Sequence, residues 1–310
     1  MNPSCARRAL PLLLAGVFLA GCTQPSAAPD PDRDVSSITE ASYLTADRWN
    51  DGKAEVAFYR VERTRDQYGR SNDQRFIVGT YLVKHRFSPD EMSKVTDGSG
   101  VSSFKYALFY EFESGSYQYK RNWVVNARQR DLKPFKQSFT SFDWCSNLYR
   151  EQAFPPSGSI EVRTRSDDYG NRRARFEAPP NAYPPAQIPL LVRGLDFGRA
   201  DTLSFAVSVA DAETHVPAQA VRQDTVTVDT EAGALEAERI AVAYEQPIPS
   251  PIGEESARAE TYWRGTGPDR LLVKMAAEDG RYRMALVEQL RTAYWKENLW
   301  PRLSRVGTRP

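Results

Sequence analysis

The sequence predicts a mainly β protein, a large curved antiparallel sheet (a half-barrel or partial barrel) with one or two short helices. Three observations support this fold. Beyond residue 41, most apolar runs alternate apolar and polar residues with a period of two, which is typical of strands that bury one face. These runs are rich in aromatic and β-branched residues, which favour strands. Turn signals separate the runs, and helical periodicity is scarce.

In the first half, we expect strands that are joined by tight hairpins. Residues 54–63 and 75–87 form the first two runs. Ser114-Gly115-Ser116 is a hairpin signal between two aromatic strands within 103–125. Residues 168–171 turn between two strands that are rich in arginine.

In the second half, a helix is expected within residues 184–197. Apolar residues recur there at helical spacing, and two prolines suit the first turn. Further strand runs follow between residues 201 and 290, and Asp279-Gly280 predicts a hairpin between the last two. A second short helix is expected within residues 292–303.

The first residues predict a lipoprotein signal peptide over residues 1–21. Two arginines precede an apolar run that is too short to span a bilayer as a mature helix. The run ends in Leu19-Ala20-Gly21-Cys22, an order that resembles the bacterial lipobox. That resemblance implies cleavage between Gly21 and Cys22 and acylation of Cys22, which would anchor the chain. The alternative is an ordinary secretory signal with an incidental cysteine.

The composition predicts an exported domain on a flexible tether. Residues 22–40 are rich in proline and small or acidic residues and cannot form a core, so residues 41–303 are expected to be one β-rich periplasmic domain with a soft seam near 150–158. Removal of residues 1–21 takes away two arginines and no acid, which leaves 39 basic against 40 acidic residues. A near-neutral chain gives no electrostatic argument for a nucleic-acid partner.

Of the three cysteines, Cys5 leaves with the predicted signal peptide and Cys22 is expected to be acylated. Only Cys145 would then stay free, so no internal disulfide is expected. Neither Cys145 nor the two histidines have metal-ligand spacing, and no metal or cofactor is expected. A catalytic pair of Cys145 with His85 needs only closeness in space. Because Cys145 follows Trp144 within an aromatic segment, we instead expect both residues in the core where the two halves of the sheet meet.

Two further groups of residues are candidates for function. Trp49, Asp51, Lys53 and Glu55 form a cluster whose carboxylates could serve acid–base chemistry, although a solvated strand edge with a Lys-Glu pair is the simpler interpretation. Five arginines flank the 168–171 turn and would make a basic face for lipid phosphates or sugar acids, or a solvated face balanced by nearby acids; these are Arg163, Arg165, Arg172, Arg173 and Arg175.

Three segments carry a family resemblance. Residues 49–69, 112–125 and 138–154 contain a W-x-D-G-K-A-E start, a Tyr-Gly turn, a Tyr-x-Tyr strand and a W-C motif, and they resemble a family of uncharacterised bacterial outer-membrane-type lipoproteins. Ser146 stands where the W-C-G-type motif of that family has glycine. The order of elements in the second half resembles the periplasmic domain-of-unknown-function family numbered 3108. The two resemblances imply an antiparallel half-barrel-like fold, and neither implies a reaction.

Two classes of function therefore stay open. The first is a non-enzymatic envelope lipoprotein that holds an apolar or amphipathic ligand on the concave face of the sheet, and the second is a structural or assembly factor that binds an envelope protein. A Cys-dependent enzyme is the third alternative. The expected location is the outer membrane, facing the periplasm, because Thr23 rather than an aspartate follows Cys22. An apolar cavity would favour the first class, and a filled core with an exposed apolar patch the second.

Overall fold

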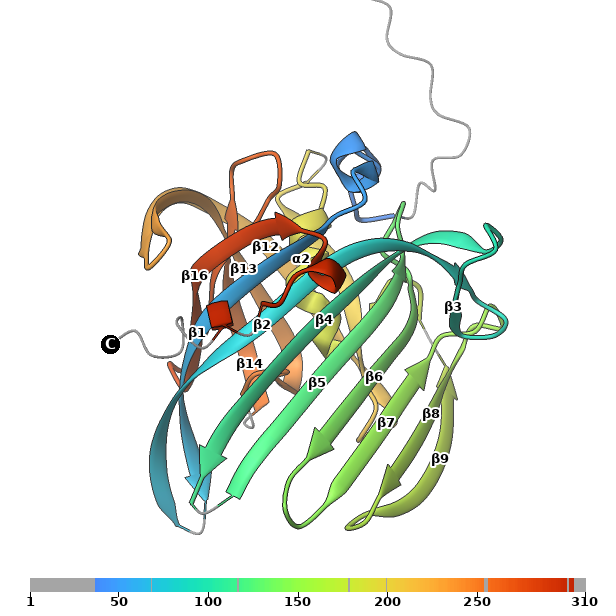
Figure 1. The fold of residues 1–310 in the computed structure, drawn as a ribbon, viewed down its shortest axis with the longest axis vertical. Coiled ribbons are helices and arrows are strands. Elements are labelled where there is room, and N and C mark those ends of the chain that lie inside the picture. The colour runs from blue at the N-terminus through green and yellow to red at the C-terminus, as the bar shows by residue number, and fades with distance from the viewer. Residues whose placement is uncertain are drawn as a thin grey trace, which may run out of the picture. The chain divides into compact units, whose positions relative to one another are not determined.

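The chain folds into one strongly curved sheet of 16 strands (Figure 1). The structure is a computed structural model that describes residues 37–303 apart from residues 68, 116, 178, 199, 254–255 and 300. The strand order is β10-β11-β12-β13-β14-β15-β16-β1-β2-β4-β5-β6-β7-β8-β9, with β3 paired to β2. Among the strands of the described residues, only the β10–β11 pair is parallel. The predicted fold class, a large curved antiparallel sheet, is confirmed.

The first wall of the sheet contains hairpins in chain order. Its elements are α1 (Ala41–Leu44), η1 (Asp47–Asn50), β1 (Ala54–Gln67), β2 (Arg70–Ser88), β3 (Ser93–Val95), β4 (Val101–Ser114), β5 (Tyr117–Arg128), β6 (Pro134–Phe142), β7 (Asn147–Ala153), β8 (Ser159–Ser166) and β9 (Gly170–Glu177). The predicted hairpins are confirmed, since Ser114 pairs with Tyr117 and Ser166 pairs with Gly170.

The second wall follows after a short internal segment. Its elements are β10 (Ala182–Tyr183), η2 (Pro185–Gln187), α2 (Ile188–Gly194), β11 (Thr202–Val209), β12 (Thr214–Thr230), β13 (Gly233–Pro249), β14 (Ser256–Gly265), β15 (Leu272–Ala277), β16 (Tyr282–Thr292) and η3 (Tyr294–Lys296). The last strand, β16, pairs with β1, so the two walls belong to one sheet. The sheet also runs from β7 to β8 without a break across residues 150–158.

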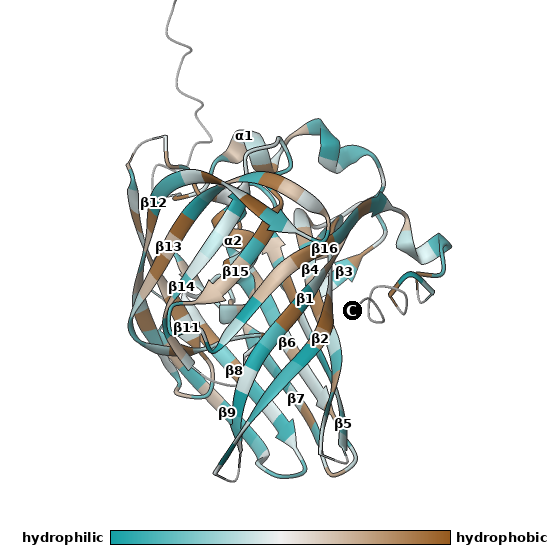
Figure 2. Cartoon of the chain, turned by 90° about the vertical axis from the view of Figure 1, so that its left-hand side faces the viewer, coloured by the Kyte–Doolittle hydropathy of each residue, from teal (hydrophilic) through white to brown (hydrophobic). Residues whose placement is uncertain are grey.

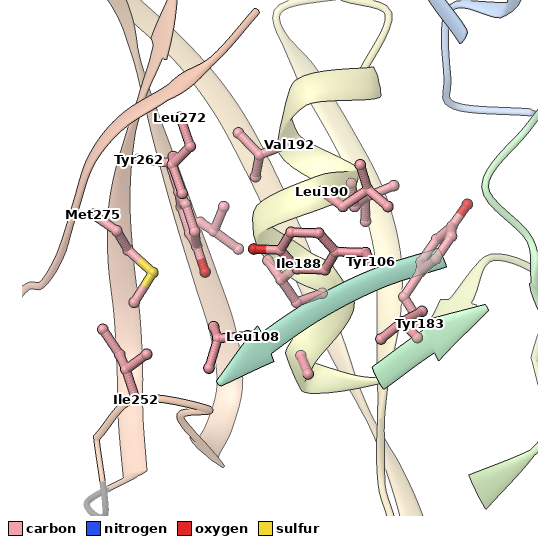
Figure 3. Close-up of a cluster of buried hydrophobic side chains, with 14 of the residues drawn as sticks. Tyr106, Leu108, Tyr183, Ile188, Leu190, Val192, Ile252, Tyr262, Leu272 and Met275 are labelled. Carbon is pink, nitrogen blue, oxygen red and sulfur yellow. The ribbon is translucent and has the colours of Figure 1, made fainter. Parts of the chain in front are cut away.

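The predicted helix, α2, lies inside the curve of the sheet, where its seven residues are all buried (Figures 1 and 3). Figure 3 shows Ile188, Leu190 and Val192 of α2 among inward side chains of β4, β14 and β15. A strongly curved sheet cannot bury its concave face against itself, and α2, whose residues are apolar apart from Arg193, fills that space. The part of the concave face next to α2 is therefore solid core.

The one charged residue of α2, Arg193, is neutralised inside the core. Its Nη1 and Nη2 donate to the two carboxylate oxygens of Glu55 on β1, at 2.7 and 3.0 Å. Its Nε and Nη2 also donate to the carbonyl oxygens of Arg270 and Asp269, at 2.9 and 2.8 Å. Burial alone would lower the pKa of Arg193, but the charge of Glu55 raises this pKa well above its usual value.

This contact corrects the interpretation of residues 53–55 as a solvated strand edge with a Lys-Glu pair. Lys53 is exposed, whereas Glu55 is 3% exposed and faces α2. The reason is the direction of β1, which turns Glu55 to the same inner face as Tyr59 and Val61.

A second arginine completes the C-terminal end of α2. Arg264 on β14 donates from Nη1 to the carbonyl oxygens of Val192 and Leu195, at 3.1 and 3.0 Å. Glu238 on β13 accepts hydrogen bonds from the same guanidinium group. A guanidinium group at this end of a helix satisfies carbonyls that lack helical partners.

Another buried carboxylate, Glu260 on β14, is fully surrounded by hydroxyl donors. Tyr244, Tyr262 and Tyr282 donate to its oxygens at 2.6, 2.6 and 2.5 Å. Burial, followed by the charge of Glu260, raises the pKa of all three phenols. The tyrosines therefore stay protonated and stabilise the carboxylate in the core.

The first wall extends beyond the helix. On β6, Gln137 accepts a hydrogen bond from the Ala186 N–H of η2 at 3.1 Å, and the strand then continues five residues further to Phe142. The far ends of β4–β9 form hairpins at the end of the domain opposite α1 (Figure 2). No helix in the described parts of the chain has the length and apolar character needed to cross a membrane.

We predict that Glu55→Gln lowers the free energy of unfolding by about 3–5 kcal/mol, because it leaves Arg193 buried without a counter-charge. Chemical denaturation measures this loss. Asp51→Asn is the matched control, since it removes a partly exposed ion pair with Arg291 and is expected to cost about 1 kcal/mol or less.

The double variant Glu55→Gln/Arg193→Met should recover part of the lost stability, because it removes both charges from the core. Equal losses for Glu55→Gln and Asp51→Asn would contradict the central role of the buried pair.

Candidate functional site

The residues singled out in the sequence do not form one site. Gly21 and Cys22 lie outside the described residues. Trp49 belongs to η1, near the end of the domain that carries α1, whereas Trp144 and Cys145 lie in the β6–β7 hairpin at the opposite end.

The group around Trp49 is structural. Trp49 is 3% exposed, and its indole N–H donates to the carbonyl oxygen of Tyr43 at 3.0 Å. Asp51 accepts hydrogen bonds from Arg291 at 2.6 and 2.8 Å, and these bonds lower the pKa of its carboxyl group. Because Glu55 is held separately by Arg193, the two carboxylates are not paired for acid–base chemistry.

The expectation that Trp144 and Cys145 lie in the core is wrong. Trp144 is 75% exposed, and Cys145 is an exposed free cysteine. Asp143 accepts the backbone N–H groups of Cys145 and Ser146, at 2.7 and 2.9 Å, so the segment is a capped hairpin turn. The neighbouring aromatics lie on the outer face of their strands, where clustering in the sequence brings no burial.

The Cys145–His85 pair is also not formed. The strand register locates both residues along β4. His85 lies opposite Ser103 of β4. Phe142, just before the turn that carries Cys145, lies opposite Lys120 of β5, which in turn lies opposite Glu111 of β4. Eight residues of β4 separate those two levels, which is roughly 27 Å along the strand. Burial, together with Lys94 and Lys105, lowers the pKa of His85 to about 4.

The candidate site is a groove on the concave face, which we call the inner groove. It begins beside η2, because Gln137 of β6 contacts η2 and the next inward residues of the same strand, Phe139 and Ser141, line the groove. Its volume is about 540 Å³. It is lined by Arg121, Trp123, Phe139, Ser141, Leu148, Arg150, Val162, Thr164, Tyr169, Arg172, Ala174, Ala210, Asp211, Glu213, Pro249 and Gly253.

The apolar part of the inner groove is built around two stacked rings. Trp123 on β5 lies opposite Phe139 on β6, with ring centroids 4.0 Å apart. Leu148, Val162 and Ala174 continue this surface across β7, β8 and β9 because every second residue of a strand faces inward.

The polar part of the inner groove consists of three arginines and two acids. Arg150 pairs with Asp211 at 2.5 Å, and Arg172 pairs with Glu213 at 2.7 Å. The guanidinium carbon of Arg121 lies 5.3 Å from the ring centre of Phe112. The formal charge of the lining is therefore positive by one unit.

Both acids belong to the turn between β11 and β12. Their side chains are 58% and 40% exposed, so these ion pairs are accessible to water and contribute little stability. Glu213 also adopts a positive φ of 52°, a conformation that is uncommon for residues other than glycine. The turn thus holds its carboxylates over arginines that could exchange them for another anion.

Buried polar atoms near this groove lack partners among the described residues. They are Nε1 of Trp123, Oε1 of Gln152 and Oγ of Ser208. Gln152 follows Arg150 on the inner face of β7, and its Nε2 donates to the carbonyl oxygen of Ser208 on β11 at 3.3 Å. Unpaired buried polar atoms are rare in folded proteins, and these three can accept or donate further hydrogen bonds near the groove.

Sequence reasoning found one groove residue, Arg172, and placed it among the five arginines of the β8–β9 hairpin. The structure divides that group. Arg172 faces inward, whereas the other four arginines face outward, because the register pairs Arg163 with Arg173, Arg165 with Asn171 and Glu161 with Arg175. The period-two alternation of the two strands could have shown from the sequence that Arg172 faces the opposite side from the other four arginines.

A second hollow lies on the outer face of the sheet. It has a volume of about 340 Å³ and is lined by Val56, Phe58, Tyr81, Phe109, Tyr294, Glu297, Asn298, Leu299 and Leu303. The short segment after β16 packs there against outward side chains of β1 and β2. This hollow is mostly apolar, unlike the inner groove.

Comparisons with known proteins assign no family to the chain. No protein-family model matches the chain, and no curated protein matches it. Among solved structures, the chain is similar to a beta-barrel-like protein of domain of unknown function DUF1849 from Brucella abortus, with a TM-score of 0.49 and 10% sequence identity. The match covers 77% of this chain and 97% of that chain.

We predict that Trp144→Ala changes the free energy of unfolding by only about 0.5 kcal/mol, because the side chain is exposed. Trp49→Ala should cost about 3–5 kcal/mol, because it removes a buried ring. Thermal or chemical denaturation distinguishes the two tryptophans.

The thiol of Cys145 should react with a bulky maleimide in the folded protein, since the hairpin leaves it accessible. Slow labelling that speeds up only on unfolding would contradict the hairpin conformation.

Proposed function

We propose that this protein is a non-enzymatic envelope lipoprotein that binds an amphipathic molecule with an anionic group in its inner groove. The proposal rests on the lining of that groove, in which a stacked aromatic pair and three arginines surround a volume of about 540 Å³. Ligand sites typically have volumes of about 300–1,000 Å³ and combine a mostly apolar lining with a few placed polar groups.

The two parts of the groove suit the two parts of such a ligand. The rings of Trp123 and Phe139, with Leu148, offer apolar contact area. Arg150 and Arg172 offer guanidinium groups, which bind carboxylate or phosphate through paired hydrogen bonds. A ligand anion would replace Asp211 and Glu213, whose partly exposed ion pairs cost little to break.

The position of α2 limits this proposal. The helix fills the upper part of the concave face, so a ligand cannot occupy the whole interior of the sheet. The open part lies toward the hairpins of β4–β9, and a ligand would enter from that end.

The anchoring also remains our proposal. Acyl chains on Cys22 would hold the domain at the periplasmic face of the outer membrane, through the tether of residues 22–40. Residues 37–40 pack on the domain, since Thr39 forms a β-bridge with Leu195 and Glu40 pairs with Arg270. The part of the predicted tether before them is about 15 residues long, and a flexible chain of that length would span roughly 20 Å on average and keep the domain near the membrane surface.

The alternative is an assembly factor that binds an envelope protein, and the apolar outer hollow favours it. Phe109→Arg would place a charge in that hollow without touching the inner groove. Loss of a co-purifying protein with retention of a bound small molecule would then separate the two functions.

We predict that Ala174→Trp abolishes ligand binding, because Ala174 faces the inner groove and a large ring would fill it. The protein is extracted gently from cells, and native mass spectrometry measures the fraction that carries a bound amphipathic anion. The matched control is Asn171→Trp, which places the same ring on the outward face of the same strand.

Arg172→Gln should lower the bound fraction without changing the fold, since Arg172 is exposed at the groove.

Equal occupancy in Ala174→Trp and Asn171→Trp would place the ligand elsewhere. If no ligand accompanies the wild-type protein and added anionic amphiphiles fail to bind it, the proposed function is wrong.

We predict that Cys22→Ala yields a precursor without acyl chains that no longer fractionates with membranes, because the thiol is the attachment atom. Detergent phase partitioning and intact-mass measurement follow the change. Cys145→Ser is the control, and it should partition like the wild type. If Cys22→Ala keeps the wild-type partitioning, the anchor is not at Cys22.

A further inference from the structure

Exposed aromatic side chains gather at one end of the domain. Eight large hydrophobic side chains are exposed in the described residues, and five of them lie in or beside the hairpins of β4–β9; these are Tyr117, Phe142, Trp144, Tyr149 and Tyr169. The rings of Tyr117 and Trp144 meet edge to face, with centroids 6.4 Å apart, so neighbouring hairpins share one aromatic surface. We call this set the aromatic rim.

An excess of positive charge lies next to the rim, on the outer face of β7–β9, where four arginines accompany three glutamates; these are Arg163, Arg165, Arg173 and Arg175 with Glu151, Glu161 and Glu177. Arg163 on β8 stands directly opposite Arg173 on β9, and Arg165 stands opposite Tyr149 on β7. Arg163, Arg165 and Arg173 are exposed, and none of them forms an ion pair with a described residue. Like charges directly opposite each other destabilise a sheet, so this arrangement needs an explanation.

None of the nearby acids forms an ion pair with these arginines among the described residues. Glu151 on β7 stands directly opposite Arg163, but it pairs with Lys136 and accepts a hydrogen bond from the hydroxyl of Tyr149. Asp143 caps its own turn, and Asp167 accepts hydrogen bonds from the backbone and side chain of Asn147. Protection of the sheet edge would explain charge on β9, the edge strand. It would not explain the two arginines on β8, which is paired on both sides, or the exposed rings of the rim.

We propose that the aromatic rim and these three arginines dock the domain onto an anionic lipid bilayer. Tryptophan and tyrosine prefer the interface between water and lipid, where one part of the ring is buried and another is hydrated. Arginine binds phosphate groups through paired hydrogen bonds, and the surface potential of anionic lipids attracts it. The inner groove opens at the same end, so docking would bring its mouth to the lipid surface.

This inference does not depend on the proposed function. The docking residues face outward or lie at the tip, and apart from Tyr169 none of them lines the inner groove. Variants for the test therefore leave Tyr169 and the groove unchanged.

The test uses the chain from residue 22 onward with Cys22→Ala, which keeps every described element and carries no acyl group. Co-sedimentation measures its binding to vesicles of phosphatidylcholine with and without one-third phosphatidylglycerol. Binding should require the anionic lipid and weaken with salt. Arg163→Gln/Arg165→Gln/Arg173→Gln should lower the partition coefficient by roughly 100-fold at low ionic strength, because each charge near the surface contributes about a factor of five.

Two matched controls isolate the rim. Trp144→Ser should weaken binding, whereas Trp295→Ser removes another exposed tryptophan, outside the hairpins, and should not. Arg130→Gln/Arg239→Gln/Arg258→Gln removes the same charge from other elements and should leave most of the binding intact. Unfolding midpoints should stay unchanged for all variants, since every substituted side chain is at least partly exposed.

Cys145 provides a direct probe, because it is the only thiol left in this chain. An environment-sensitive fluorophore on Cys145 should shift to shorter wavelength on anionic vesicles and be quenched by spin-labelled lipids. Docking is overturned if the chain ignores anionic vesicles, if the control variants lose as much binding as the rim variants, or if the probe stays in water while the chain sediments. Binding of an acidic protein to the arginines without any vesicle binding would also overturn it.

Discussion

The ion pair between Arg193 and Glu55 connects the helix inside this protein to the sheet around it. A sheet that curves this strongly needs an element of its own chain to fill its concave face, and α2 is that element. The helix carries one charged side chain into a core where an isolated charge would be prohibitive. Four hydrogen bonds to Glu55, Asp269 and Arg270 remove that cost and fix the helix against β1 and the loop before β15. Hydrogen bonds satisfy two further buried charged groups in the same way: Arg264, at the C-terminal end of α2, and Glu260, among three tyrosines.

The length of this internal helix divides the concave face into two regions with different chemistry. Beside α2 the inner side chains are mostly apolar, and the charged groups Arg193, Glu55 and Arg264 have their partners in place. Beyond Gln137 no helix covers the strands, and the same inner face carries arginines next to aromatic rings. The first region supplies stability, and the second retains exposed ion pairs that a ligand could replace. The proposed binding site thus lies where the helix that fills the sheet ends.

The hairpins of β6–β9 present different chemistry on their two faces. Neighbouring residues such as Arg172 and Arg173, or Leu148 and Tyr149, point to opposite sides because the period of a strand is two. One short stretch of sequence can therefore serve the inner groove and an outer docking surface at once. A shift of one residue in register would exchange the two faces, so the capped turn at Asp143 and the β8–β9 turn matter for both.

The sequence by itself determined the features that depend on neighbouring residues. The strand runs, the hairpins at 114–117 and 279–280 and the helix within 184–197 follow from periodicity and turn chemistry, and the structure contains all of them. Only the tertiary structure decided which strand face meets α2, and hence that Glu55 is buried and Tyr149 is exposed. Alternation defines two faces but does not say which one lies inside a curved sheet, and that depends on contacts between residues more than a hundred positions apart, such as Glu55 and Arg193. The inner groove could not be predicted for the same reason, because its lining comes from six strands, β5–β9 and β13, and from the distant turn between β11 and β12.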